Sequence, residues 1–526
     1  MARKREMTDQ APVSDTFTLT PGLRRFLYLT AAVCGAAILI VEILGAKMLA
    51  PYFGTSHFVW TAQIAVTLIS LSAGYYAGGW FVDRTRNLGR LFACIFAAAL
   101  YLGLTVPLCR PVAAACLDLK LATGSLLASG FLFLVPLGLL AMSSPFLVRV
   151  MTSSLGGVGK QAGRLSAIST AGSVLGTVLI GYVLIPFFPN SVTMLCTSGS
   201  LAILAAAYLI AWGSGLRARS GLGMILLTGI VGYLVLLPED RTLPGFREIE
   251  RSNSNFGMLQ VMKADGEPYY FLLNDLLAQN CYDTRRRQSV HSFTYLLNLL
   301  SHAYTPAISN ALFIGMGVGI VPMQFTREGI TVDVVEINPA MVGVAERHFD
   351  FSRSRVNLSI DDGRHFLNRV PRQYDTIILD AFVGDSSPSH LMTREAFAAM
   401  RVALRPHGTL VINSFGNLRP DDDYYTASLY KTLSSVFKTV KIHAAENDGN
   451  IFFVASDQPQ LAFLHQPDLT TVHPDLLETV TKAVHRTVET DTRHGRVLTD
   501  DFNPVEYYDA QNRERLRRGL VAWTIR

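Results

Sequence analysis

Acidic residues and glycines recur at the ends of successive apolar runs between residues 310 and 385. The residues concerned are Gly315, Gly317, Gly319, Glu336, Asp362, Gly363 and Asp380. A glycine-rich loop lets a ligand approach the backbone closely. An acid after the next apolar run can accept hydrogen bonds from both hydroxyl groups of a ribose. The order and spacing of these residues therefore predict a site for a nucleoside ligand.

The apolar runs that must position these residues lie at 311–319, 331–339, 358–367 and 374–382. They are rich in β-branched residues. A helix-length segment separates the first run from the second, and another separates the second from the third. This alternation predicts strands and helices of an α/β unit with a parallel sheet. Ligands of such sheets bind beyond the carboxyl ends of the strands, which is where the glycines and acids fall.

The glycine loop itself reads GMGVGI. A dinucleotide-binding fingerprint has a third glycine where this chain has Ile320. A ligand of the S-adenosylmethionine type carries a single adenosine and fits the shorter loop better. NAD is the weaker alternative.

Length and composition indicate more than one domain. The chain has 526 residues, of which 50% are hydrophobic, and a mean hydropathy of +0.29. The apolar residues concentrate between about 26 and 237, and the rest has the composition of a globular protein. A net charge of +5 does not indicate a nucleic-acid partner. The six cysteines have no spacing typical of a metal site or a disulfide framework.

The amino-terminal half predicts an α-helical multi-span membrane domain. Residues 1–23 are polar and predict a cytosolic tail rather than a cleavable signal. Within 24–237, seven candidate spans have about 20 residues each, as a bilayer requires. They lie at about 26–50, 59–82, 91–109, 125–148, 166–187, 191–212 and 219–237. The small-residue run 172–176 suits close packing of two such helices.

The charged residues of the amino-terminal half indicate how the chain is oriented in the membrane. Basic residues cluster in alternate gaps: Arg24, Arg25, Arg84, Arg86, Arg90, Arg149, Lys160, Arg164, Arg217 and Arg219. The positive-inside rule then predicts a multi-pass protein of the cell inner membrane with a cytosolic amino terminus. Glu42 and Lys47 lie inside the first span, where charges are usually paired or functional. An ion pair between helices near the membrane interface and a path for a substrate are the two interpretations.

The side of the membrane that carries the carboxy-terminal domain stays open. Seven spans place it outside, whereas a nucleoside ligand of this type is a cytosolic metabolite. Either the glycine-rich segment 221–237 does not cross fully, or the count is wrong by one, or the domain works outside. The chemistry of the ligand favours a cytosolic domain.

The carboxy-terminal half predicts two units after a linker at 238–253. Segments 256–263 and 269–275 alternate as a β-hairpin of a small β domain, 254–290. A Rossmann-like domain, 291–526, follows. Its predicted elements are a helix at 289–303, a polar loop over the site after Asp380, a helix from about 394, strands at 410–414, 440–444 and 451–455, and a basic helix at 512–526.

These residues resemble the spermidine synthase family, the polyamine aminopropyltransferases, over about 254–508. The whole chain is similar to bacterial members fused to a multi-span membrane segment, through the stretches 49–61, 167–177 and 498–506. The resemblance implies a small β domain followed by a Rossmann-like domain of the class I methyltransferase type. It also implies transfer of an aminopropyl group from decarboxylated S-adenosylmethionine, a co-substrate, to a diamine such as putrescine. No permanently bound cofactor or metal is expected.

The resemblance also assigns roles to single residues. Gln279 is expected to contact the thioadenosine, Glu336 the ribose, and Asp362 with Gly363 the adenine. Asp380 corresponds to the proposed base: a protonated amine has no lone pair, and a neighbouring carboxylate can bind and deprotonate it. A further substrate contact falls on either His291 or Tyr295.

Two acids of the family pattern are replaced. Val318 stands in the glycine loop where the family has an Asp that helps to hold the amino end, and Val383 stands at the second Asp of the catalytic loop. Asp385 lies two residues later and could substitute. A hydrogen bond between an acid and an ammonium group contributes about 1.5–3 kcal/mol. The adenosine half of the site therefore matches the family better than the amine half.

Three functions fit the sequence. The first is a membrane-anchored aminopropyltransferase acting on a polyamine. The second is another S-adenosylmethionine-type transferase, such as a methyltransferase. The third is a transport or sensing membrane protein that binds a nucleoside or a polyamine without turnover. The acceptor amine and the oligomeric state stay open, with a homodimer as one alternative.

Overall fold

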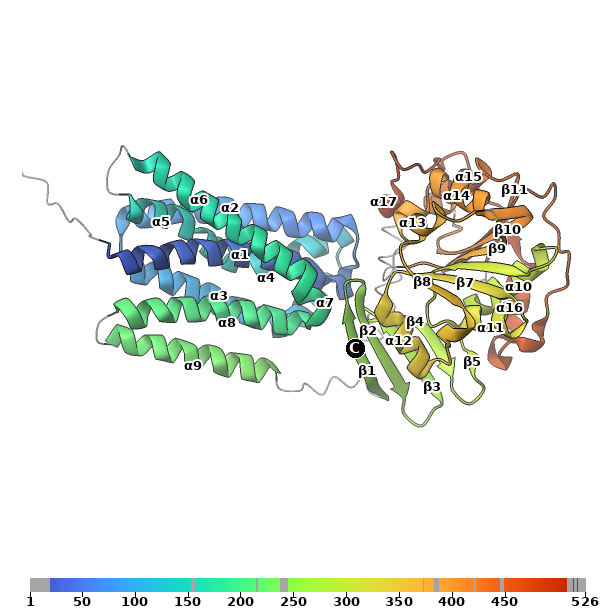
Figure 1. Ribbon diagram of the computed structural model, residues 1–526, viewed down its shortest axis with the longest axis horizontal. Helices are drawn as coiled ribbons and strands as arrows, with labels where there is room; N and C mark the ends of the chain where they lie inside the picture. Colours follow the sequence, from blue (N-terminus) through green and yellow to red (C-terminus); the bar gives the residue numbers. More distant parts are fainter. Residues whose placement is uncertain are drawn as a thin grey trace, which may run out of the picture.

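The computed structural model describes residues 19–152, 157–213, 216–236, 245–371, 373–382, 387–419, 422–444 and 449–508, together with Glu514 and Arg518. A bundle of long helices comprises the amino-terminal half, and an α/β part comprises the carboxy-terminal half (Figure 1). The two halves predicted from the sequence are thus both present.

The bundle contains nine α-helices within its described residues. They are α1 (Pro21–Phe53), α2 (His57–Arg84), α3 (Leu88–Cys116), α4 (Leu121–Ala141), α5 (Ser143–Met151), α6 (Val158–Leu179), α7 (Ile185–Phe187), α8 (Asn190–Trp212) and α9 (Leu216–Leu236). A short π-helical segment, Ile180–Leu184, joins α6 to α7. The helices run up and down the long axis of the bundle (Figure 1).

In the described part of the chain, six helical stretches are long and apolar enough to cross a membrane. They are Pro21–Phe53, His57–Arg84, Leu88–Cys116, Leu121–Met151, Val158–Phe187 and Asn190–Trp212. The predicted count of seven therefore falls to six by length and composition. The seventh predicted span is α9, in which the apolar stretch Ser220–Leu234 is shorter.

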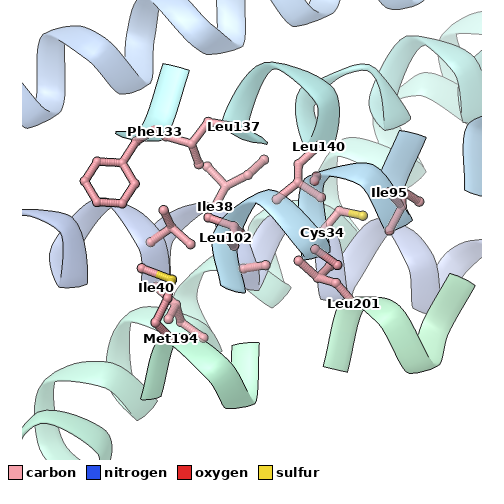
Figure 2. Close-up of a cluster of buried hydrophobic side chains, with 14 of the residues drawn as sticks. Cys34, Ile38, Ile40, Ile95, Leu102, Phe133, Leu137, Leu140, Met194 and Leu201 are labelled. Atoms are coloured by element: carbon pink, nitrogen blue, oxygen red, sulfur yellow. The ribbon is translucent and has the colours of Figure 1, made fainter. Parts of the chain in front are cut away.

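Side chains of four helices fill the centre of the bundle. Cys34 and Ile38 of α1 lie among Leu102 of α3, Leu137 of α4 and Leu201 of α8 (Figure 2). Large apolar side chains also cover the outside of the bundle, as in the 60% exposed Leu68, the 70% exposed Leu175 and the 61% exposed Ile203. A helix that is apolar on all sides is typical of a membrane span.

Small residues let α1 and α6 approach each other closely. A Cβ added to Gly172 would lie 2.1 Å from the carbonyl oxygen of Ala32, and one added to Gly176 would lie 2.7 Å from that of Ala36. Such contacts leave no room for a larger side chain. The prediction of close helix packing at 172–176 is confirmed.

The first unit of the α/β part is a five-stranded antiparallel sheet. Its strands are β1 (Phe246–Ser254), β2 (Gly257–Ala264), β3 (Tyr269–Asn274), β4 (Leu277–Asp283) and β5 (Gln288–Ser289), in the order β1-β2-β3-β4-β5. The hairpin predicted at 256–263 and 269–275 is confirmed as β2 and β3. The predicted linker 238–253 is wrong from Phe246 onwards, because β1 pairs there with β2. This edge strand alternates between half-buried and exposed residues and carries charges, so it lacks an apolar signal.

The second unit is an eight-stranded sheet with helices on both faces (Figure 1). The strands are β6 (Asn310–Ile314), β7 (Thr331–Glu336), β8 (Asn357–Ile360), β9 (Tyr374–Leu379), β10 (Leu404–Phe415), β11 (Thr439–Ala444), β12 (Asn450–Ser456) and β13 (Thr487–Val488). The helices are α10 (Ser292–Tyr304), α11 (Ile320–Arg327), α12 (Pro339–His348), α13 (Gly363–Leu367), α14 (Arg394–Ala403), α15 (Tyr424–Ser434), α16 (Leu477–His485) and α17 (Val505–Tyr508).

The strand order is β13-β11-β12-β10-β9-β6-β7-β8. Strands β8, β7, β6, β9 and β10 are parallel, which confirms the predicted Rossmann-like sheet. The chain continues from β6 to β7 on one side and later returns to β9 on the other side of β6. In open α/β sheets, ligands bind at such a switch point. The basic helix predicted at 512–526 lies outside the described residues except for Glu514 and Arg518.

Candidate active site

A cavity of about 550 Å³ opens at the switch point between β6 and β9, and residues of the small sheet also line it. The predicted site residues along its wall are Gln279, His291, Gly315, Gly317, Glu336, Asp362, Gly363 and Asp380. Gly319 and Tyr295 do not line it, and Val383 and Asp385 lie outside the described residues. The fold thus brings together groups that are up to a hundred residues apart in the chain.

The glycine loop connects β6 to α11. Gly315 has φ +90°, and a Cβ there would lie 2.3 Å from the carbonyl oxygen of Asp380. Gly319, the residue before α11, has φ +77°, and a Cβ added there would lie 2.3 Å from the ring of Phe351. At both positions a side chain is excluded, because the positive φ disfavours any residue other than glycine and because neighbouring atoms fill the space. Gly319 therefore packs against Phe351 and sets the conformation of the loop, while Gly315 and Gly317 line the cavity.

Glu336 ends β7 and is only 7% exposed. Its Oε2 accepts a hydrogen bond from the backbone N–H of Met316 at 3.0 Å, and its Oε1 accepts one from the N–H of Asn338 at 2.7 Å. Burial raises the pKa of this carboxyl group, and the backbone hydrogen bonds oppose that rise. Each carboxylate oxygen can accept a second hydrogen bond, so both can still bind hydroxyl groups of a ligand.

Asp380 follows the last residue of β9. Its Oδ1 accepts a 2.8 Å hydrogen bond from Nδ2 of Asn413, and Oδ1 of Asn413 accepts one of 2.8 Å from Nδ2 of Asn450. Burial raises the pKa of Asp380 to about 6, although the bond from Asn413 lowers it. A carboxyl group with this pKa is largely ionised near neutral pH and can accept a proton.

Asp362 caps the amino end of α13. Its Oδ1 accepts hydrogen bonds from the backbone N–H groups of Arg364 and His365 at 2.9 and 3.1 Å, and Oδ2 lies 2.8 Å from Nε2 of His390. Burial raises the pKa of Asp362, but the bonds from His390 and the backbone outweigh it, and the pKa lies below its usual range. Asp362 is therefore an anionic group held in a fixed orientation beside the cavity.

The structure separates the two candidates on the helix before β6. Tyr295 is 1% exposed, and its hydroxyl group donates a 2.8 Å hydrogen bond to the carbonyl oxygen of Ser289. His291 precedes α10 and lines the cavity. Of the two alternatives, His291 is the one that a ligand can reach.

Three further side chains, which no sequence pattern indicated as site residues, also line the cavity: Asn413, Asn450 and His390. Asn413 offered a signal, because it is an amide that directly follows the apolar run 410–412 near the carboxyl end of β10. His390 offered none, because its partner Asp362 is distant in the sequence.

Comparison with known proteins identifies the family. A model described as the spermine/spermidine synthase domain matches residues 299–461. A polyamine aminopropyltransferase of Vibrio vulnificus is 30% identical over 223 residues, which are 40% of this chain and 74% of the relative. The chain belongs to the polyamine aminopropyltransferase family.

Membership of the polyamine aminopropyltransferase family makes the chain a transferase and confirms the resemblance. An N-terminal histidine N-methyltransferase of Emericella nidulans is 34% identical over 139 residues, which are 26% of this chain and only 24% of the relative. Among solved structures, the spermidine synthase of Thermotoga maritima aligns with a TM-score of 0.36 at 15% identity, over 45% of this chain and 88% of that chain.

Proposed function

We propose that the chain is a membrane-anchored aminopropyltransferase. It transfers an aminopropyl group from decarboxylated S-adenosylmethionine to putrescine or a related amine and releases methylthioadenosine. The observation that carries this proposal is Asp380, a half-buried carboxylate with a pKa of about 6 that shares one cavity with Glu336 and the glycine loop.

The adenosine half of the donor is assigned to the wall formed by the small sheet and the carboxyl ends of β6, β7 and β8. Gln279 would contact the thioadenosine, Glu336 the two ribose hydroxyl groups, and Asp362 with Gly363 the adenine. A Cβ at Gly363 would lie 2.5 Å from the side chain of Ile314, so a larger residue there would displace the wall. The cavity volume of about 550 Å³ is in the range of about 300–1,000 Å³ that is typical of small-molecule sites.

Asp380 would act as the base in the transfer. The nitrogen lone pair of the amine attacks the aminopropyl carbon that is bonded to the sulfonium sulfur. As the new C–N bond forms, the C–S bond breaks and its electron pair returns to sulfur, which becomes the neutral thioether of methylthioadenosine. The amine must be neutral for this step, and Asp380 takes its proton. Because Asn413 engages Oδ1, we assign Oδ2 to the amine.

The six apolar helices support anchoring in the cell membrane. Basic residues cluster at one end of the bundle, which supports a multi-pass arrangement in the inner membrane with a cytosolic amino terminus. In this arrangement the lipid bilayer surrounds the helical bundle and is a partner of the chain. A homodimer stays a prediction from the sequence.

A second candidate function is methyl transfer from S-adenosylmethionine to an amine. The similarity to the Emericella nidulans methyltransferase favours it. Val318 favours it too, because this side chain lines the cavity, is only 2% exposed and cannot pair with an ammonium group. The same base would serve, since methyl transfer to an amine also requires removal of a proton.

One experiment separates the two functions. Purified full-length protein in detergent is given putrescine with either decarboxylated or intact S-adenosylmethionine, and the products are identified by mass spectrometry. Spermidine and methylthioadenosine from the decarboxylated donor, both lost in Asp380→Asn, are expected. Asp457→Asn is a matched control, because Asp457 pairs with Arg401 outside the cavity. A methylated amine formed only from the intact donor would favour the second function, and an unchanged rate in Asp380→Asn would disprove the role of Asp380.

A further inference from the structure

The two ends of the helical bundle differ in charge. At the end that holds the start of α1, the helix termini and the short loops between them carry Arg24, Arg25, Arg84, Arg86, Arg90, Arg149, Lys160, Arg164, Arg217 and Arg219. At the opposite end, within the described part of the bundle, the basic residues are Lys47, Arg110 and Lys120. The first end will be called the basic end and the second the charge-poor end.

The transferase domain docks on the charge-poor end (Figure 1). Lys47 of α1 donates a 2.8 Å hydrogen bond from Nζ to the carbonyl oxygen of Asn255, between β1 and β2. The backbone N–H of His57, at the start of α2, donates a 2.9 Å bond to Oε2 of Glu506 in α17. Lys47 therefore contacts the transferase domain.

Helix α9 connects the bundle to this domain and decides how often the chain crosses. It has 21 residues, which span about 30 Å at 1.5 Å per residue, the thickness of the apolar part of a bilayer. It lies along α8 (Figure 1). A Cβ at Gly221 would lie 2.9 Å from the side chain of Ile210 in α8. Helix α9 starts at the basic end and runs toward the charge-poor end, so its path is that of a seventh crossing, although its apolar stretch Ser220–Leu234 is shorter than those of the other six.

We infer that the transferase domain lies on the non-cytosolic side of the membrane. The inference rests on the membrane anchoring proposed above. Lysine and arginine in short loops favour the cytosolic side, so the basic end is cytosolic. The charge-poor end, with the domain attached to it, is then outside. This orientation reverses the expectation of a cytosolic domain that the ligand chemistry alone had favoured.

Two walls of the active-site cavity are attached to this outer end. Phe256 lines the cavity. It follows Asn255, whose carbonyl oxygen accepts the hydrogen bond from Lys47. On the other side, Nδ2 of Asn503 donates a 2.7 Å hydrogen bond to the carbonyl oxygen of Ser389, beside the cavity residue His390. Asn503 and Glu506 belong to one short segment, so His57 anchors that wall too. The acceptor is accordingly an amine present on the non-cytosolic side, and the adenosyl donor must reach that side as well.

Cysteine labelling of the full-length protein in intact cells tests the orientation without any assay of activity. Gln460→Cys places a thiol on an exposed part of the transferase domain. Gly159→Cys, the matched variant, places one at the basic end, where an added Cβ meets nothing within 4 Å. Cells whose outer envelope is permeable to small molecules are treated with a membrane-impermeant maleimide, and a permeant maleimide shows that both thiols react. Wild-type protein gives the background of the native cysteines.

The expected result is labelling of Gln460→Cys and protection of Gly159→Cys from the impermeant reagent. Labelling of Gly159→Cys alone, of both variants, or of neither would overturn the inference, provided that a cytosolic marker protein stays unlabelled. The outcome does not depend on turnover. An inactive enzyme with the expected labelling would count against the proposed function and not against the orientation.

Discussion

Asn413 lies in β10, Asp380 directly follows the neighbouring parallel strand β9, and Nδ2 of Asn413 donates a 2.8 Å hydrogen bond to Oδ1 of Asp380. Asn450 fixes the orientation of the Asn413 amide, because Nδ2 of Asn450 donates a hydrogen bond to Oδ1 of Asn413. The NH₂ group of Asn413 must therefore face the carboxylate. This bond stabilises the ionised form of Asp380 against the effect of burial.

Asn413→Ala should shift the pH dependence of the reaction upward. Loss of the hydrogen bond leaves burial unopposed, so the pKa of Asp380 rises above its value of about 6. A base works only when it is ionised, so the acid limb of kcat/KM should move to higher pH by about one unit, as for a charged hydrogen bond. The measurement is kcat/KM between pH 5 and 9. Asn357→Ala, at a surface pair with Asp333, should leave the limb in place, and an unmoved limb in Asn413→Ala would contradict the assignment.

Asp380→Asn should make the protein more stable at neutral pH while it removes activity. Burial raises the pKa of Asp380 from 3.8 to about 6, so between these values the folded chain binds more protons than the unfolded chain. The free energy of unfolding therefore falls as pH rises from 4 to 6, by about 3 kcal/mol in total. We expect a higher melting temperature for Asp380→Asn at pH 8, with the difference vanishing below pH 4. A lower melting temperature at pH 8 would show that the charge stabilises the fold.

Much of the fold could be predicted because it depends on local patterns. The strands β6, β7, β9 and β10 are apolar runs separated by helix-length segments, and the helices of the bundle are long apolar segments. Strand β1 could not be found, because an edge strand is half exposed and carries charges. Helix α9 was ambiguous, because its apolar stretch Ser220–Leu234 is short for a span and its path is evident only from packing on α8.

The site was predictable where a residue type follows from its place in the sheet, as for Glu336 and Asp380. It was not predictable where a side chain acts through a partner distant in the sequence, as for Asn413 with Asp380. The choice between His291 and Tyr295 depended on where α10 begins, since a shift of a few residues changes which side chain faces the cavity. Helix ends are poorly fixed by sequence patterns.

Glu336→Gln should weaken binding of the adenosyl donor. Both oxygens of Glu336 accept bonds from backbone N–H groups, and the amide of Gln would turn a donor toward one of them. Loss of a charged hydrogen bond corresponds to about 1.5–3 kcal/mol, or a Kd raised by roughly 10- to 100-fold. Calorimetric titration with methylthioadenosine measures this. Glu328→Gln, at a pair with His302 directly after α11, is the control. Equal Kd values for the two variants would argue against contact of Glu336 with the ribose.

Val318→Asp should change which donor the enzyme prefers. Val318 lines the cavity where the family resemblance places an acid that holds the ammonium end of the aminopropyl group. An added carboxylate should favour decarboxylated over intact S-adenosylmethionine by about tenfold, because the intact donor also carries a carboxylate that it repels. The ratio of the two kcat/KM values gives the answer. Val318→Asn, similar in size and uncharged, should not change this ratio, and a change of the same size in both variants would exclude a charge effect.

Lys47→Met should raise KM more than it lowers kcat, although Lys47 belongs to the bundle. Lys47 lies six residues before the end of α1, about 9 Å along the helix axis, and its long side chain reaches the carbonyl oxygen of Asn255. Without that bond the turn that carries Phe256 loses a support, and the cavity wall should become less ordered while Asp380 stays in place. We expect a severalfold higher KM for the donor with kcat nearly unchanged, and recovery in Lys47→Arg. Lys120→Met, at the same end of the bundle, should behave as wild type, and the same rise of KM in that variant would indicate a general effect of the helical bundle.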